Sequence, residues 1–324
     1  MRLRVATFNL ENLDEPRKGG PALEARIEVL RPQVLALRAD VLCLQEVSAR
    51  TGHGATRSMR ALDLLLEGTE LEGFARASTI GSSGGPADKH NLVVLSRLPI
   101  RASRQHWHDA VEPPVVRLTT TPAPTSHEIR WDRPVLEVHL DCPDGRPLVV
   151  FDAHLRAPLA APVEGQKLGP LSWRTTAGWA EGYLVAAIKR AGQALELRKR
   201  VDELLDGAPA ARILVAGDLN TDLTGTALRI LRADPEDTGN PALADRALVA
   251  LEDLVPEERR YSVLHRGRRQ MLDHLLASRA LAAAHVATEI DNGGLLDEYE
   301  VGAAGIEPLG SLHAPVVAEL ELAG

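Results

Sequence analysis

Cysteines, aromatic residues and long apolar stretches are scarce in this chain of 324 residues, and each shortage excludes a class of protein. The two cysteines, Cys43 and Cys142, are too few for a disulfide-stapled fold and favour a reducing compartment. No apolar run approaches the ~20 residues of a membrane-spanning helix, and the first residues do not resemble a signal peptide. Aromatic residues make up only 3% of the chain, so a nucleic acid would find few side chains on which its bases could stack. We expect a cytoplasmic protein with no membrane partner.

Positive charge is also in deficit, because 37 Lys and Arg residues face 45 Asp and Glu residues and leave a net charge of −8. This balance argues against a protein that holds polyanions by bulk charge. It does not exclude a nuclease, since a bound metal ion supplies local positive charge. The length suits one large domain, and neither a repeat nor a linker divides the chain. We expect a single domain over residues 1–324.

The apolar pattern mixes strands with helices. Apolar spacings of three and four predict helices over 21–38 and 179–206, and shorter helices near 56–67 and after residue 220. In the long helix, the residues expected to face inward are Leu184, Ile188, Ala191, Leu195 and Leu204. Stretches 101–133 and 156–178 show no clear period and are expected to be an irregular or hairpin insertion and a loop. Alternating or continuous apolar runs predict strands at 2–9, 40–47, 74–79, 91–96, 133–140, 146–155, 212–217, 261–265, 271–278 and 314–320. This order favours a layered α/β domain, with stacked sheets and helices outside.

Polar residues recur where these strands end, and strand ends can hold a site rigidly. Taken singly, each has a simpler explanation: Asn9 could satisfy a turn, and His154 could be a hydrogen-bonded core histidine. Glu46 is harder to explain in this way, because a carboxylate on a buried strand needs a partner or a metal. The combination therefore predicts one cluster, formed by Asn9, Glu11, Glu46, His154, Asp218, Asn220, Asp273 and His313.

The residue types in this cluster suit hydrolysis of a phosphoester. Carboxylate oxygens favour a hard cation such as Mg²⁺ or Mn²⁺, which would neutralise phosphate oxygens. The amides of Asn9 and Asn220 can donate to phosphate oxygens or to the attacking water. A carboxylate such as Asp218 can accept a proton from that water, and a histidine paired with a carboxylate, as His313 with Asp273, can donate to the phosphate. We therefore predict a metal-dependent phosphoester hydrolase.

The order of motifs resembles the endonuclease/exonuclease/phosphatase superfamily, which includes pancreatic deoxyribonuclease. The segments that carry the resemblance span residues 5–317 and read "TFNLEN", "LCLQEV", "VVLSRLPI", "VVFDAHL", "VAGDLN", "LDHLLAS" and "SLHAPV". The resemblance implies a four-layer α/β sandwich, in which two packed mixed sheets are flanked by helices. It also implies that the site lies at one edge of the sheets.

The resemblance further implies a role for each residue. Asn9 and Glu46, with Glu11 as an accessory acid, match the metal-site positions of the family. The residues that match the family's catalytic positions are His154, Asp218, Asn220, Asp273 and His313. One position departs from the family pattern of Ser-Asp-His, because this chain has Leu312 between Ser311 and His313. We therefore expect fewer carboxylates around the metal.

Three functions remain open from the sequence. The first is a phosphodiesterase or nuclease, for which the basic segment 259–270, just before Asp273, is a candidate phosphate-facing patch. Arg156, two residues after His154, is a further candidate for substrate binding. The second function is a phosphatase of a small molecule or lipid headgroup. The third is a catalytically weakened scaffold or binding protein, for which Leu312 is the only support. We read His274, beside Asp273, as structural.

The sequence leaves the substrate and the oligomeric state open.

Overall fold

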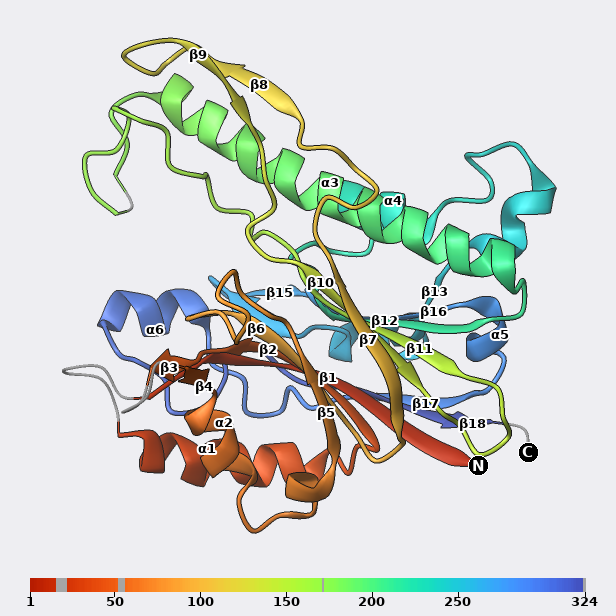
Figure 1. Ribbon diagram of the computed structural model, residues 1–324. Coiled ribbons are helices and arrows are strands. Elements are labelled where there is room, and N and C mark those ends of the chain that lie inside the picture. Colours follow the sequence, from red (N-terminus) through yellow and green to blue (C-terminus); the bar gives the residue numbers. More distant parts are fainter. Residues whose placement is uncertain (16–21, 52–55, 171, 323–324) are drawn as a thin grey trace.

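A computed structural model describes residues 1–15, 22–51, 56–170 and 172–322 of the chain. Two six-stranded mixed sheets pack face to face and carry helices on their outer faces (Figure 1). The first sheet has the order β17 (His285–Ile290), β18 (Val316–Glu321), β1 (Arg2–Leu13), β2 (Val41–Val47), β6 (Asn91–Ser96) and β5 (Ala75–Ser78). The second has the order β13 (Val249–Ala250), β16 (Asp273–Ala277), β12 (Arg212–Asp218), β11 (Leu148–His154), β10 (Val135–Leu140) and β7 (Ile100–His106).

The remaining elements are three small hairpins and the helices. The hairpins pair β3 (Arg50–Thr51) with β4 (Arg57–Ser58), β8 (Val115–Leu118) with β9 (Thr125–Glu128), and β14 (Val263–His265) with β15 (Arg268–Gln270). The α-helices are α1 (Leu23–Ala36), α2 (Arg60–Leu66), α3 (Thr176–Gly207), α4 (Thr226–Arg232), α5 (Arg279–Ala282) and α6 (Glu298–Ala304). Short 3-10 helices cover Glu70–Gly73, Pro241–Arg246, Leu251–Leu254 and Glu257–Arg259.

Three buried clusters define four layers, as predicted. The central cluster lies between the sheets and includes Val5 and Cys43, whereas Phe8 and Leu44 point to the opposite face, toward α1 and α2. Successive side chains of a strand point to opposite faces, so an almost continuous apolar strand is covered on both sides. A third cluster packs α3 and α4 against the outer face of the second sheet. The predicted four-layer α/β sandwich is therefore confirmed.

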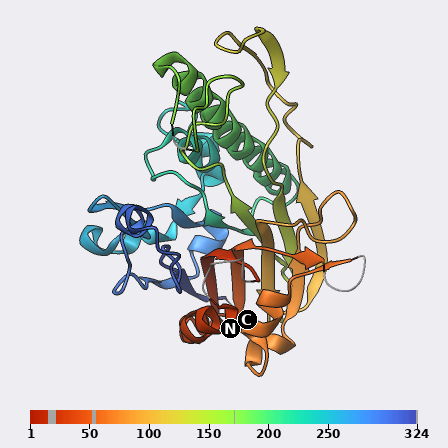
Figure 2. The same ribbon diagram turned by 90° about the vertical axis from the view of Figure 1, so that its left-hand side faces the viewer.

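Helix α3 differs in part from the prediction in the face that it buries. Leu184 and Leu195 are 50% and 38% exposed, whereas Ile188 and Leu204 pack against buried clusters as predicted and Ala191 is half-buried. The fully buried residues of the helix include Val185, Leu197 and Val201. The reason is that the two halves of this helix meet different neighbours. Its second half packs on the second sheet, whereas its first half packs on the β8–β9 hairpin and the loop after β11. Both views show this first half and the hairpin projecting beyond the sheets (Figures 1 and 2).

Some elements were not predicted from the sequence. The edge strand β17 and the short helices α5 and α6 fall between the predicted strands 271–278 and 314–320. The insertion at 101–133 is a hairpin insertion as expected, but it also contains most of β7, which joins the second sheet. Both cysteines are free and buried. Across the described residues, no helix has the length and apolarity needed to cross a membrane.

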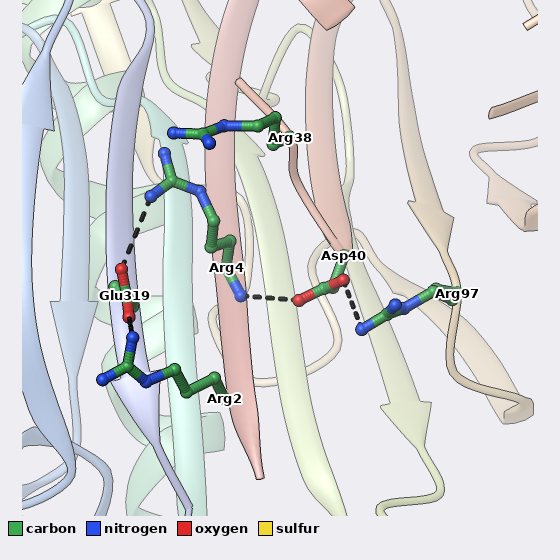
Figure 3. Close-up of a pocket in the computed structure, with 6 residues that line it drawn as sticks. All are labelled: Arg2, Arg4, Arg38, Asp40, Arg97 and Glu319. Atoms are coloured by element: carbon green, nitrogen blue, oxygen red, sulfur yellow. Dashed lines mark hydrogen bonds and ion pairs between the residues drawn. The ribbon is translucent and has the colours of Figure 1, made fainter. Parts of the chain in front are cut away.

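Paired charges line the first sheet at the end where β1 begins. There, Arg4 pairs in register with Glu319 of β18, and its backbone N–H donates to Asp40 (2.8 Å). Asp40 also forms an ion pair with Arg97 at 2.6 Å (Figure 3). These residues, with Arg2 and Arg38, line a pocket of about 350 Å³. Opposite charges on neighbouring strands stabilise a sheet modestly, so we interpret this end as structural.

Candidate active site

The predicted site residues meet at the edge where β1, β2, β11 and β12 end. The parallel pairing of β1 with β2 places Asn9 beside Gln45, and that of β11 with β12 places His154 beside Asp218. Strand β16 runs antiparallel to β12 and places Asp273 opposite Asp218. The backbone of the first sheet therefore presents Asn9, and that of the second presents His154, Asp218 and Asp273, at one edge.

Asn9 links the carboxylates of the two sheets. Its Nδ2 donates to Asp218 Oδ2 at 3.1 Å and to Glu46 Oε1 at 3.4 Å. Its Oδ1 accepts from the backbone N–H of Glu11 at 2.9 Å. Glu46 also accepts from the backbone N–H of Asn12 at 2.9 Å. One amide therefore holds two carboxylates from different sheets together.

Left-handed backbone conformations gather at this edge. Among non-glycine residues, φ is +49° at Glu11, +61° at Glu46 and +52° at Asn220. Such conformations are uncommon outside glycine and cost of order 1–3 kcal/mol unless surrounding contacts hold them. At Asn220, the backbone N–H donates to Asp218 Oδ1 (3.0 Å) and Nδ2 donates to the Leu155 carbonyl (3.1 Å). The site residues are therefore held by their surroundings at positions that strand geometry alone would not give them.

His313 is oriented by two neighbours from other segments. Its Nδ1 lies 2.8 Å from Asp273 Oδ2, and its backbone N–H donates to the Ser311 hydroxyl, which in turn donates to the Asn9 carbonyl. Burial disfavours the charged ring, but the carboxylates of Asp273 and Asp218 outweigh it and raise the pKa of His313 well above its usual range. Its Nε2 faces Asp218 Oδ2 at 4.0 Å. His313 is thus a cation aimed at the centre of the cluster.

His154 has the opposite character. Burial, followed by the charge of Arg133, holds the pKa of His154 well below its usual range. The Arg133 guanidinium contacts Nδ1 of His154. A guanidinium can only donate, so Nδ1 accepts and Nε2 carries the proton. That Nε2 lies 3.3 Å from Asp218 Oδ2 and 3.8 Å from Glu46 Oε1. His154 is therefore a neutral donor beside both carboxylates.

Asp218 is a carboxyl group of the cluster whose own pKa lies near neutrality. Burial is the main cause that raises the pKa of Asp218 to about 7, and the charges of Asp273 and Glu46 add to it while His313 opposes it. Burial likewise raises the pKa of Glu11, whose carboxyl group lies in the field of His313, Glu46 and Glu298. Without added positive charge, these carboxylates therefore disfavour one another's ionisation.

The residues present fit a divalent cation. Two groups have ligand atoms within 4.8 Å of one another: Glu46 with His90 and His154, and Asp218 with Asp273 and His313. A cation would relieve the repulsion among the converging carboxylates, whose oxygens suit Mg²⁺ or Mn²⁺. In the protonation states described above, His154 and His313 offer no free nitrogen, so the carboxylate oxygens would be the ligands. Asn9 cross-links two of the carboxylates through its amide nitrogen, as described above.

The structure adds three residues that sequence reasoning missed and leaves one predicted residue outside. His90 lies 3.9 Å from Glu46, and Glu298 lies 4.0 Å from His313, while Arg133 contacts His154. These residues lie in loops or at the start of α6, so no periodic pattern marked them. Arg156 does not reach the cluster, because its guanidinium pairs with Asp132 at 3.4 Å. His274 is fully buried against Glu252, as expected of a structural residue.

An α/β sandwich with carboxylates, an amide and histidines at the ends of its central strands is the architecture of a phosphoester hydrolase. The sequence profile of the Endonuclease/Exonuclease/phosphatase family matches residues 6–305. The chain belongs to this family, as the motif order predicted, and this membership places it among metal-dependent phosphoester hydrolases.

Solved structures support the fold. A truncated Caenorhabditis elegans TDP2 shares 14% identity at a TM-score of 0.56, with 99% of this chain and 98% of that chain covered. A Bacteroides thetaiotaomicron mannosyl-6-phosphatase shares 17% identity at a TM-score of 0.56, with 99% and 100% covered. The 3' phosphatase NExo from Neisseria, bound to a product DNA hairpin, shares 18% identity at a TM-score of 0.52, with 99% and 100% covered. A comparison with curated proteins found no significant match.

Proposed function

We propose that this protein is a Mg²⁺- or Mn²⁺-dependent phosphodiesterase of the nuclease type, which hydrolyses its substrate by attack of water on phosphorus. The observation that carries the proposal is the meeting of Glu46, Asp218 and the Asp273–His313 pair around Asn9. The positive charge of His313 suits an anionic phosphoester whose charge increases on attack, and the carboxylates would hold the cation that offsets their own charge.

In this proposal, Glu11 and Glu46 would hold the cation through their carboxylates, and Asn9 would bind it through Oδ1 once that oxygen releases the Glu11 N–H. When bound, the ion neutralises phosphate oxygens and stabilises the charge that develops on attack. The closely spaced carboxylates support this assignment, because they disfavour one another's ionisation until a cation is present.

The other residues act on the water and the phosphate. Asp218, with a pKa of about 7, is suited to accept the proton of the attacking water, and Asn220 holds Asp218 in place through its backbone N–H. The His313 imidazolium donates to a phosphate oxygen, and Asp273 fixes its orientation. His154, neutral with its proton on Nε2, is a second donor. Arg156 would contact substrate only after leaving Asp132.

Two other functions have an observation in their favour. A phosphatase acting on a small molecule or lipid headgroup is consistent with two structural neighbours, a mannosyl-6-phosphatase and a 3' phosphatase. A weakened scaffold is consistent with Leu312, which is 6% exposed and places no carboxylate between Ser311 and His313. We further propose that residues 1–324 act as one domain, because both sheets contribute to one core and one site. We also propose a cytoplasmic location, for which the two free cysteines are the support.

The test is hydrolysis of plasmid DNA, single-stranded RNA and bis-p-nitrophenyl phosphate in Mg²⁺ or Mn²⁺, with Glu46→Gln and His313→Ala as matched variants. Cleavage that both variants lose supports the proposal and gives the substrate class. Turnover of none of the three substrates contradicts it. In that case, activity gained by Leu312→Asp would indicate a weakened enzyme, whereas continued inactivity would favour a small phosphoester or a scaffold.

A further inference from the structure

The β14–β15 hairpin and α6 form a surface next to the active site that the proposed catalytic roles do not use. We call the residues His265, Arg266, Arg268, Arg269 and Tyr299 the rim platform. The hairpin contains three arginines within four residues, and α6 supplies the tyrosine. Both elements lie near one another in Figure 1.

The aromatic part of the rim platform is exposed and held in place. Tyr299 is 46% exposed. The Arg266 guanidinium lies 4.2 Å from the centre of its ring, and the His265 ring meets it edge-on at 6.2 Å. Asp297 caps the start of α6 by accepting from the backbone N–H of Tyr299 at 2.9 Å, and it also accepts from Arg266 and Gly267 of the hairpin. An exposed ring that is fixed by both elements is available to stack on a flat ligand.

The arginines of the rim platform have no carboxylate partners in the part of the chain that the structure describes. Within the described residues, none of Arg266, Arg268 and Arg269 forms an ion pair with a carboxylate, although Arg269 donates to the Glu258 carbonyl. Most arginines elsewhere in this acidic chain do form such pairs, for example Arg97 with Asp40 and Arg200 with Glu137. The acids next to the platform are Asp297, Glu298 and Glu300 of α6, of which Asp297 accepts from hairpin backbone groups and Glu298 pairs with His265. The positive charge of the platform is therefore confined to the three hairpin arginines, and an anion would complement that side.

Short contacts connect the rim platform to the catalytic histidine. Val263, at the start of β14, forms a backbone bridge with His313. His265 Nδ1 lies 3.1 Å from Glu298 Oε2, and Glu298 Oε1 lies 4.0 Å from His313 Nε2. Arg266 is three residues beyond Val263, which corresponds to roughly 10 Å along an extended strand. A chain molecule whose phosphodiester lies at His313 would thus place its next unit over the rim platform.

We infer that the rim platform binds the unpaired nucleotides of a single-stranded nucleic acid next to the scissile phosphodiester. The inference rests on the proposed function and narrows its substrate class. Tyr299 stacks on a base, and Arg266 and Arg268 contact backbone phosphates. Stacking of a base on an aromatic side chain contributes about 1–3 kcal/mol and tolerates any sequence, but it needs a base that is not paired.

The test is the affinity of the full-length protein for a fluorescein-labelled single-stranded DNA oligonucleotide, measured by anisotropy in EDTA so that no cleavage occurs. Tyr299→Ala should weaken binding about 5- to 150-fold, and Tyr299→Phe should retain most of it. Arg266→Ala combined with Arg268→Ala should weaken binding and lower the slope of its salt dependence by about 2. The matched control is Arg38→Ala, which removes an exposed arginine without a carboxylate partner in the described residues at the opposite end of the sheets (Figure 3).

Several results would overturn the inference. The inference is wrong if Tyr299→Ala, like the control Arg38→Ala, binds the single-stranded oligonucleotide as tightly as the unmodified protein does. It is also wrong if Tyr299→Ala loses as much affinity for a duplex of the same sequence as for the single strand. A loss of affinity seen only with phosphatidylserine vesicles would instead indicate a membrane surface and overturn it too. In Mn²⁺, Tyr299→Ala should lower kcat/KM for the oligonucleotide at least about 5-fold more than for bis-p-nitrophenyl phosphate. Because binding is measured without catalysis, a protein that binds the oligonucleotide through Tyr299 but cleaves nothing would contradict the proposed function alone.

Discussion

Asp218 offers a stability measurement that tests the electrostatics of the active site without an assay of activity. We expect Asp218→Asn to make the metal-free protein more stable at about pH 8.5 while removing the proposed base. The reason is the burial that raises the pKa of Asp218 to about 7, far above the 3.8 of an unperturbed aspartate. Between these values the folded state binds more protons than the unfolded state, so the stability of the unmodified protein falls as the pH rises through this window.

The size of the effect follows from the difference between the two pKa values. Ionising such a carboxyl group above pH 7 costs the folded state about 4 kcal/mol relative to the unfolded state. The asparagine avoids this cost and can still accept from the Asn220 N–H through its oxygen. Its amide nitrogen then faces Nδ2 of Asn9, which loses a hydrogen bond of about 1–1.5 kcal/mol. We therefore expect a net gain of about 2–3 kcal/mol at about pH 8.5 and almost none at about pH 4.5.

The assay is urea unfolding of both proteins in EDTA at the two pH values, followed by circular dichroism. Asp152 is also buried, and burial raises its pKa well above the usual range, but it is present in both proteins and cancels in the difference. A free-energy difference that is the same at both pH values would refute the reasoning, because it would show that Asp218 does not change its protonation in this window.

Three further variants test other parts of the structure. Mn²⁺ at 100 times its Kd should stabilise the unmodified protein by about 2.7 kcal/mol in thermal unfolding, and an undiminished shift in Glu46→Gln would argue against Glu46 as a ligand. Gly217→Ala should lower the free energy of unfolding by about 3 kcal/mol or more, because φ is +142° and a Cβ would lie 1.8 Å from the Ala153 carbonyl oxygen. The control is Gly207→Ala, where a Cβ would meet open space, and equal urea midpoints for the two variants would contradict the expectation. Glu252→Ala should cost about 3–5 kcal/mol by leaving His274 without its buried partner, and a loss below ~1 kcal/mol would show that the pair is dispensable.

The core of the site could be predicted because its residues follow strands with unmistakable patterns. Strands β2, β11 and β12 are otherwise largely apolar, so Glu46, His154 and Asp218 stand out at their ends, although Gln45 and Asp152 also interrupt β2 and β11. Strands β11 and β12 are adjacent and parallel, so His154 and Asp218 had to be neighbours once these strands paired. Glu46 joins them from the other sheet, because the two sheets pack face to face. Here local pattern and tertiary structure require the same arrangement.

The residues that could not be predicted reach the site from segments without such a pattern. Arg133 precedes β10 in an insertion with no clear period, and His90 ends a loop rich in glycine and serine. Glu298 opens a seven-residue helix in which no residue is buried, so no apolar face marked that helix. The predicted inward face of α3 was wrong at Leu184 and Leu195 for a related reason. A helix that packs on a hairpin at one end and on a sheet at the other has no single apolar face to detect.

Leu312 has a different meaning in the sequence and in the structure. From the sequence, a leucine between Ser311 and His313 suggested a loss at the metal end of the site. In the structure, the Ser311 hydroxyl still joins His313 to Asn9, and Asp273 still orients the His313 ring, so neither contact depends on the side chain at 312. The substitution therefore removes a negative charge without disturbing the catalytic pair. Its consequence should appear in metal affinity before it appears in the geometry of His313, and Glu11 and Glu298 would add to Asp218 and Asp273 as carboxylates near that histidine.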